Sequence, residues 1–194
     1  MPGATAVGIT YNNGVLLASE KRISYGNFVV NKNTKKTFSV TDHVGAACAG
    51  MVADMQVLVR QVRALSKIRR LETRRDVQPN SVAKLMSVIM FERRYFPLLT
   101  QVIVGGITTQ PEIYTLDPLG SVLPDTYAAV GTGAEMALGV MDAEFSANMD
   151  EEAATKLALR AIKSSIQRDA ASGDGIDILI INKDGKRELT HSAV

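Results

Sequence analysis

The order of strand-like and helix-like segments constrains the fold of this chain more than any other feature of its sequence. Strand-like segments come first, two helix-like segments follow, and the same succession then repeats before a final pair of strands. The predicted strands cover residues 5–10, 15–18, 36–40, 43–49, 101–107, 112–116, 127–130 and 176–181. The predicted helices cover residues 52–71, a segment that begins after Asn80 or Ser81, and residues 134–146 and 150–171. Runs of strands followed by runs of helices favour stacked layers over alternating βαβ units.

Local signals support several of these segments. The tripeptide Asn-Asn-Gly at 12–14 is typical of a hairpin turn between the first two strands. Asn182 to Gly185 similarly turns the chain towards a last strand. Asp150 is a good N-cap for the last helix, and the two glutamates after it favour the positive end of the helix dipole. The helix over 52–71 carries one apolar face, formed by Val52, Met55, Val59, Val62 and Leu65.

The strand over 176–181 indicates how the layers are stacked. It is apolar at every position except Asp177, with no alternation of polar and apolar residues. Strands of this kind are buried on both faces. We therefore expect an α+β fold, a four-layer αββα sandwich of two mainly antiparallel sheets between two helix layers, in a single domain over residues 1–194.

Composition excludes several classes of function. The chain has 194 residues, of which 46% are hydrophobic and 22% charged, as in ordinary globular domains. The formal net charge of +2 comes from 22 Lys and Arg against 20 Asp and Glu, so we expect no nucleic-acid partner. A single cysteine, Cys48, excludes an internal disulfide framework, and two histidines are too few for the commoner zinc sites. No apolar run reaches the roughly 20 residues of a membrane-spanning helix, and no signal peptide is visible. We expect a cytoplasmic protein that needs no membrane, cofactor or metal.

Seven short segments carry a family resemblance that covers nearly the whole chain. They are ATAVGI at 4–9, ASEKR at 18–22, KK at 35–36, ACAG at 47–50, VGG at 104–106, GTG at 131–133 and QRDAASG at 167–173. Together, in this order and spacing, they resemble the β subunits of the archaeal 20S proteasome. The resemblance implies the αββα sandwich of N-terminal-nucleophile hydrolases, in agreement with the order of segments.

The resemblance also implies a chemistry. In this family a threonine becomes the N-terminal residue by self-cleavage after a glycine, and its own amino group helps to activate its hydroxyl. A lysine lowers the local proton affinity and is held by an acidic residue. A glycine N–H forms the oxyanion hole, and a Ser/Thr, an Asp and a Ser organise the terminal amine.

These roles transfer to the present chain at one constant offset. The nucleophile position is Ala4, the lysine is Lys36 and its acidic partner is Glu20. The oxyanion glycine is Gly50, and the residues that organise the amine are Thr132, Asp169 and Ser172. The same offset assigns a substrate pocket to Ile23, Thr34, Cys48 and Val52. The implied partners are proteasome α subunits and other β subunits in stacked heptameric rings, with unfolded proteins delivered by an ATPase regulator.

The nucleophile position departs from the family pattern. It is Ala4, preceded by Gly3, and a methyl group cannot attack a carbonyl or cleave its own leader. Thr5 does not replace it, because alternation along a strand turns Thr5 to the opposite face and its spacing to Lys36 is 31 residues instead of 32. We expect a chain that is inert by itself, whose leader at 1–3 is not removed by self-cleavage.

Simpler interpretations of the same residues stay open. Lys36 could be one of two solvated lysines, although the resemblance predicts that it pairs with Glu20. Asp169 could be a helix-end carboxylate, with Ser172 and Gly173 as a plain helix stop. Thr132 could cap the helix that follows it. The basic residues on the helix over 52–71 favour a solvated or subunit-contacting face over a nucleic-acid patch.

Three explanations of Ala4 remain. The chain could be a natural, non-catalytic β subunit that helps to build the ring, which is the explanation we favour. It could be a catalytic β subunit carrying an engineered Thr→Ala substitution. It could also be an assembly or scaffold ring protein with no protease role, although such a protein has no evident need for Glu20, Lys36, Asp169 and Ser172.

Overall fold

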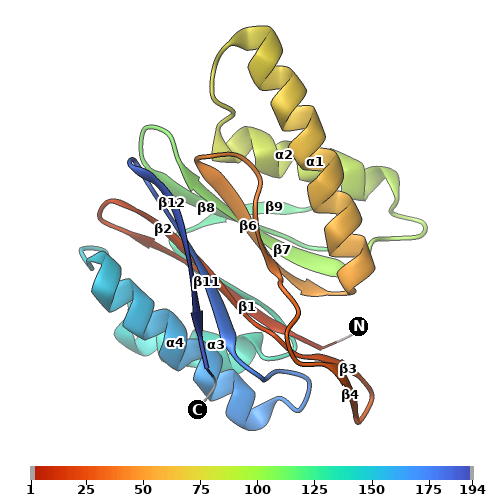
Figure 1. Ribbon diagram of the computed structural model, residues 1–194, viewed down its shortest axis with the longest axis vertical. Helices are drawn as coiled ribbons and strands as arrows, with labels where there is room; N and C mark the ends of the chain where they lie inside the picture. The colour runs from red at the N-terminus through yellow and green to blue at the C-terminus, as the bar shows by residue number, and fades with distance from the viewer. Residues whose placement is uncertain (1–2, 193–194) are drawn as a thin grey trace.

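The computed structural model describes residues 3–192 and contains two five-stranded sheets, a two-stranded hairpin and four helices within that range (Figure 1). The strands of the first half are β1 (Thr5–Tyr11), β2 (Gly14–Glu20), β3 (Ile23–Tyr25), β4 (Phe28–Asn31), β5 (Thr37–Ser39) and β6 (Val44–Gly50). Those of the second half are β7 (Thr100–Ile107), β8 (Pro111–Leu116), β9 (Val122–Asp125), β10 (Tyr127–Gly131), β11 (Ile176–Asn182) and β12 (Gly185–His191). The helices are α1 (Val52–Thr73), α2 (Pro79–Glu92), α3 (Ala134–Glu144) and α4 (Glu151–Arg168).

Both large sheets are antiparallel. The first has the strand order β10-β1-β2-β11-β12 and the second the order β5-β6-β7-β8-β9. The central strands are buried along almost their whole length, because each sheet is covered on both faces.

Three hydrophobic cores separate the four layers. One lies between the second sheet and helices α1 and α2, and a second lies between the first sheet and helices α3 and α4. The third lies between the two sheets and is lined mainly by small and β-branched side chains. The predicted α+β sandwich of two sheets between two helix layers is therefore confirmed. No helix within residues 3–192 has the length and apolar character needed to cross a membrane.

Several helix boundaries differ from the sequence-based ones. Helix α2 begins at Pro79 with Gln78 as its N-cap, two or three residues before the predicted start. Proline suits this first position because its missing N–H would lack a helical partner there in any case. Helix α4 ends at Arg168 instead of 171, because Asp169 leaves the helical conformation and its carboxylate takes other partners. The predicted N-cap of this helix is confirmed, since the Asp150 carboxylate accepts a hydrogen bond from the N–H of Ala153 at 2.8 Å.

The short outer strands were not predicted. The hairpin β3–β4 exposes most of its apolar side chains, including Tyr25 and Phe28, so no alternation of polar and apolar residues marks it. Strand β9 contains Pro124 and is also largely exposed, as expected for a strand at the edge of a sheet. Pairing with a neighbouring strand, more than local sequence, forms these elements.

Candidate functional site

The candidate site is built around the start of β1. Thr5 pairs with Gly131 of β10, so the chain beyond β10 runs directly past Ala4. The Ala4 side chain is buried in the core between the sheets, together with Ala49. Gly3 packs so closely on the loop after α4 that an added Cβ would lie 2.1 Å from the Cβ of Ala171.

Thr5 faces away from Ala4, as predicted. Its Oγ1 lies 2.8 Å from the Oγ of Ser172, on the side of the sheet that α3 and α4 cover. Ser172 gives its one hydroxyl proton to Asp169, so Thr5 is the donor of the bond between the two hydroxyls. The side chain of Thr5 is fully buried and engaged in this network.

A chain of hydrogen bonds holds the backbone nitrogen of Ala4. The N–H of Ala4 donates to Thr132 Oγ1 at 3.2 Å, and Thr132 Oγ1 donates to Asp169 Oδ2 at 2.6 Å. Ser172 Oγ donates to the same carboxylate oxygen at 2.7 Å. The three residues predicted to organise the terminal amine are thus brought together at residue 4. Thr132 does not cap α3, whose N-cap is Gly133.

A buried ion pair lies next to this network. The Nζ of Lys36 contacts Glu20 Oε1, and the two side chains are 1% and 0% exposed. The same carboxylate oxygen accepts the N–H of Thr5 at 3.3 Å, which places the ammonium group beside the peptide between Ala4 and Thr5. The other oxygen accepts the N–H groups of Arg22 at 2.7 Å and Gly173 at 3.1 Å. The predicted pairing of Lys36 with Glu20 is confirmed, and Lys36 is not a solvated lysine.

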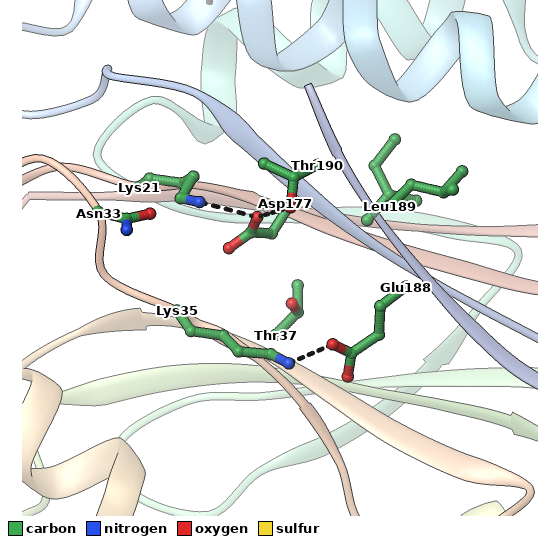
Figure 2. A pocket seen from close by; sticks show the side chains of 9 residues that line it. Lys21, Asn33, Lys35, Thr37, Asp177, Glu188, Leu189 and Thr190 are labelled. Atoms are coloured by element: carbon green, nitrogen blue, oxygen red, sulfur yellow. Dashed lines mark hydrogen bonds and ion pairs between the residues drawn. The ribbon is translucent and has the colours of Figure 1, made fainter. Parts of the chain in front are cut away.

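The lysines next to Lys36 and Glu20 in sequence, Lys35 and Lys21, form ion pairs outside this network. Figure 2 shows Lys35 pointing toward Glu188 across a cavity, with Lys21 pointing toward Asp177 on another wall. Lys35 and Glu188 are about half exposed, at 48% and 52% of their side chains. Of the two adjacent lysines just before β5, Lys36 is therefore buried and Lys35 is exposed.

Burial and neighbouring groups shift the pKa values of both Lys36 and Glu20. Burial lowers the pKa of the Lys36 ammonium, and the carboxylate of Glu20 opposes that shift. Burial likewise raises the pKa of Glu20, while Lys36 and the backbone N–H groups of Gly173 and Arg22 oppose the increase. A lysine with a lowered pKa surrenders a proton more readily than a solvated one, as general acid–base chemistry requires.

Two glycines near Ala4 have conformations that exclude a side chain. Gly50 ends β6 with φ +131°, and an added Cβ would lie 2.2 Å from the carbonyl oxygen of Leu99. Gly131 ends β10 with φ +99°, and an added Cβ would lie 2.0 Å from the carbonyl oxygen of Ala4. Both positions therefore require glycine, for the backbone angle and for space.

The predicted substrate-pocket residues differ in how deeply they are buried. Cys48 is fully buried in the core beneath α1 and α2, and burial raises the pKa of its thiol. Val52, at the start of α1, is half-buried against the same core. Ile23 and Thr34 are also half-buried, and the hydroxyl of Thr34 donates to the side chain of Asn31. The pocket assignment stays a prediction.

Sequence reasoning missed the support given by Arg22. Its Nε donates to Asp174 Oδ2 at 2.7 Å, and its Nη1 donates to the carbonyl of Ala170 at 3.0 Å. These bonds tie the end of β2 to the loop after α4, where Gly173 contacts Glu20. Asp174 adopts a left-handed conformation with φ 66°, and no local pattern in the sequence indicates its partner 152 residues away.

The arrangement brings the predicted lysine, its acidic partner and the three amine-organising residues together near residue 4, but no nucleophile. Thr132 holds the nitrogen of residue 4, and the ammonium group of Lys36 lies beside this residue. The methyl side chain of Ala4 has no atom that can attack a carbonyl. Within the isolated chain this geometry supports no nucleophilic reaction at residue 4.

Comparisons with known proteins agree with the fold. Residues 1–181 match the family described as proteasome subunit. The chain is similar to proteasome subunit beta 1 of Cenarchaeum symbiosum, with 65% identity over 193 residues that cover all of both chains. It is 66% identical to proteasome subunit beta 1 of Nitrosopumilus maritimus over 98% of this chain and 96% of that one. Proteasome subunit beta 2 of Pyrobaculum calidifontis is 46% identical over 96% of this chain and 92% of that protein. The chain therefore belongs to the family of archaeal 20S proteasome β subunits.

Proposed function

We propose that this chain is a non-catalytic, structural β subunit of the 20S core particle. The observation that carries the proposal is Ala4 at the position where a nucleophile would be needed. The surrounding groups are those of a threonine peptidase, so the chain contributes a dormant site to a particle whose peptide-bond cleavage depends on another subunit.

The contacts of each residue support its proposed role in the dormant site. Thr132, Asp169 and Ser172 would orient the amino group of an N-terminal residue 4. Thr132 already accepts a hydrogen bond from its nitrogen at 3.2 Å, and Asp169 links Thr132 to Ser172 through bonds of 2.6 and 2.7 Å. Lys36, held by Glu20, would lower the proton affinity of a hydroxyl on that residue. Gly50 would donate its N–H to the developing oxyanion.

The surface supports assembly with other subunits. Large apolar side chains are exposed near the end of α2, with Phe96 91% and Tyr95 79% accessible. Exposed apolar side chains gathered in this way mark protein interaction sites. We propose that α subunits and other β subunits cover such surfaces in stacked heptameric rings, in the cytoplasm. Unfolded proteins delivered by an ATPase regulator would be the substrates of the particle.

The test is to restore the missing hydroxyl. Particles in which this chain is the only β subunit are compared with particles carrying Ala4→Thr, by hydrolysis of a fluorogenic peptide and by mass spectrometry of the N-terminus. The parent should be silent, and the revertant should lose its leader after Gly3 and hydrolyse peptide. The matched control is Ala6→Thr, which adds a threonine to the same face of β1, two residues away, and should stay silent.

Each outcome separates the explanations of Ala4. An active parent would overturn the non-catalytic assignment. A revertant that assembles but neither loses its leader nor hydrolyses peptide would favour a scaffold protein, whose buried network serves only stability. An active revertant leaves two origins, a natural alanine and an engineered Thr→Ala substitution, which the codon at position 4 of the source gene distinguishes.

A further inference from the structure

A basic cavity lies beside α1, and none of the residues around Ala4 lines it. It is formed by α1, the turn between β5 and β6, and β12, and has a volume of about 410 Å³. Its charged or buried polar lining residues are Asp42, Arg63, Ser66, Lys67, Arg70 and Lys186. A volume of this size is within the range of small-molecule sites.

Positive charge exceeds negative charge in this cavity. Four of its side chains are cationic, and Asp42 is the one carboxylate that lines it. Arg70 contacts Asp42 at 3.0 Å and Lys186 contacts it at 3.5 Å, so both compete for one negative charge. Arg70 also reaches Asp76, outside the lining, at 3.1 Å. The two carboxylates leave two positive charges without a counterpart.

The uncompensated cations are Arg63 and Lys67. Arg63 donates from Nε at 3.0 Å and from Nη2 to the carbonyl oxygen of Ser39, which is a neutral acceptor. The side chain of Lys67 forms no hydrogen bond or ion pair with any residue of the range 3–192. The two residues lie four positions apart on α1, so they share one face of the helix.

A buried hydroxyl in the same lining also lacks a partner. Ser66 is 2% exposed, and its Oγ has no hydrogen-bond partner within residues 3–192. Buried polar groups without a partner are uncommon, because the cost of removing them from water is not recovered. An acceptor atom bound in the cavity would satisfy this hydroxyl.

We propose that this cavity binds a phosphate group, either as the free ion or on a small molecule. A phosphate dianion matches the two uncompensated charges of Arg63 and Lys67, and its oxygens accept hydrogen bonds from those side chains and from Ser66. A monocarboxylate supplies one negative charge and leaves one cation without a counterpart. This site is separate from the residues around Ala4 and does not depend on catalytic activity.

The test measures binding of inorganic phosphate to the full chain by calorimetry at constant ionic strength, with acetate in a parallel titration. We expect saturable, one-to-one phosphate binding and much weaker acetate binding. Lys67→Gln should weaken phosphate binding about tenfold, which corresponds to the loss of one charged hydrogen bond. Ser66→Ala should weaken binding several-fold, yet leave the melting temperature without phosphate unchanged or higher, because it removes an unsatisfied hydroxyl.

The matched control is Lys84→Gln, which removes an exposed lysine of α2 outside the cavity. It should leave phosphate binding unchanged. Absence of saturation at about 20 mM phosphate would overturn the proposal, since a dissociation constant above that concentration corresponds to less than about 2.3 kcal/mol of binding free energy. Equal binding of acetate, or equal weakening by Lys67→Gln and Lys84→Gln, would also overturn it by revealing a general charge effect.

Discussion

At the scale of single residues, the two adjacent lysines show how burial changes the energetics of an ion pair. Lys36 and Glu20 are removed from water, and Glu20 has three backbone N–H donors besides the ammonium group. Lys35 and Glu188 remain half exposed to water. Removing one member of a buried pair leaves a charge without solvent or partner, whereas an exposed partner is solvated again.

We predict that Lys36→Met lowers the free energy of unfolding by about 3–5 kcal/mol, the typical cost of an unpaired buried charge. The neighbouring variant Lys35→Met should lower it by no more than about 1 kcal/mol. Urea denaturation of both variants measures the difference. The double variant Lys36→Met with Glu20→Gln should cost less than the sum of its single changes, because it leaves no unpaired charge. Equal effects of the two lysine substitutions would contradict this account.

At the scale of secondary-structure elements, two glycines differ in whether neighbouring atoms leave room for a side chain. Gly139 lies inside α3, and an added Cβ would meet no atom within 4 Å. Gly106 lies in β7, and an added Cβ would lie 2.3 Å from the carbonyl oxygen of His43. Glycine weakens the helix through backbone entropy, but in the sheet it permits close approach of the backbones.

Gly139→Ala should therefore raise the free energy of unfolding by about 0.5–1 kcal/mol, the helix-propensity difference between glycine and alanine. Gly106→Ala makes the same chemical change and should lower it, because a neighbouring backbone has to move. Thermal unfolding of the two variants, followed by circular dichroism, provides the measurement. A destabilised Gly139→Ala would contradict the prediction.

At the scale of the whole molecule, Arg22 and Asp174 connect parts of the chain that are far apart in sequence. Asp174 follows α4, and Arg22 follows β2, the central strand of the first sheet. The hydrogen bond from Arg22, and to a smaller extent its charge, lower the pKa of Asp174 below its ordinary value of 3.8, against the effect of burial. The contact therefore stabilises the folded state only while Asp174 is ionised.

The direction of the pH dependence follows from that lowered pKa. The stabilisation is fully present above the unfolded-state value near 3.8 and is lost as the pH falls through the lower folded-state value. Asp174→Asn, which tolerates the left-handed backbone at φ 66°, should reduce stability at pH 7 and flatten its decline below pH 3.8. Urea denaturation across this pH range, with the exposed Asp184→Asn as control, checks the prediction. An acid profile as steep in Asp174→Asn as in the parent would contradict it.

The sequence by itself determined the larger elements and the layer architecture. Apolar periodicity marks α1, and unbroken apolar runs mark strands such as β11, because burial repeats with the geometry of each element. Family resemblance then identified Glu20, Lys36, Thr132, Asp169 and Ser172 by position. Alternation along β1 was enough to predict that Thr5 faces away from Ala4.

Only the tertiary structure decided which of these side chains meet and what state they are in. Lys35 and Lys36 are identical in type, and the packing of the segment just before β5 buries one and leaves the other half exposed. The bond between Arg22 and Asp174 spans 152 residues and has no local signal. The start of α2 and the strands β3, β4 and β9 depend on packing and edge pairing. Periodicity reports which face of an element is buried, whereas contacts between distant segments depend on how complete elements pack.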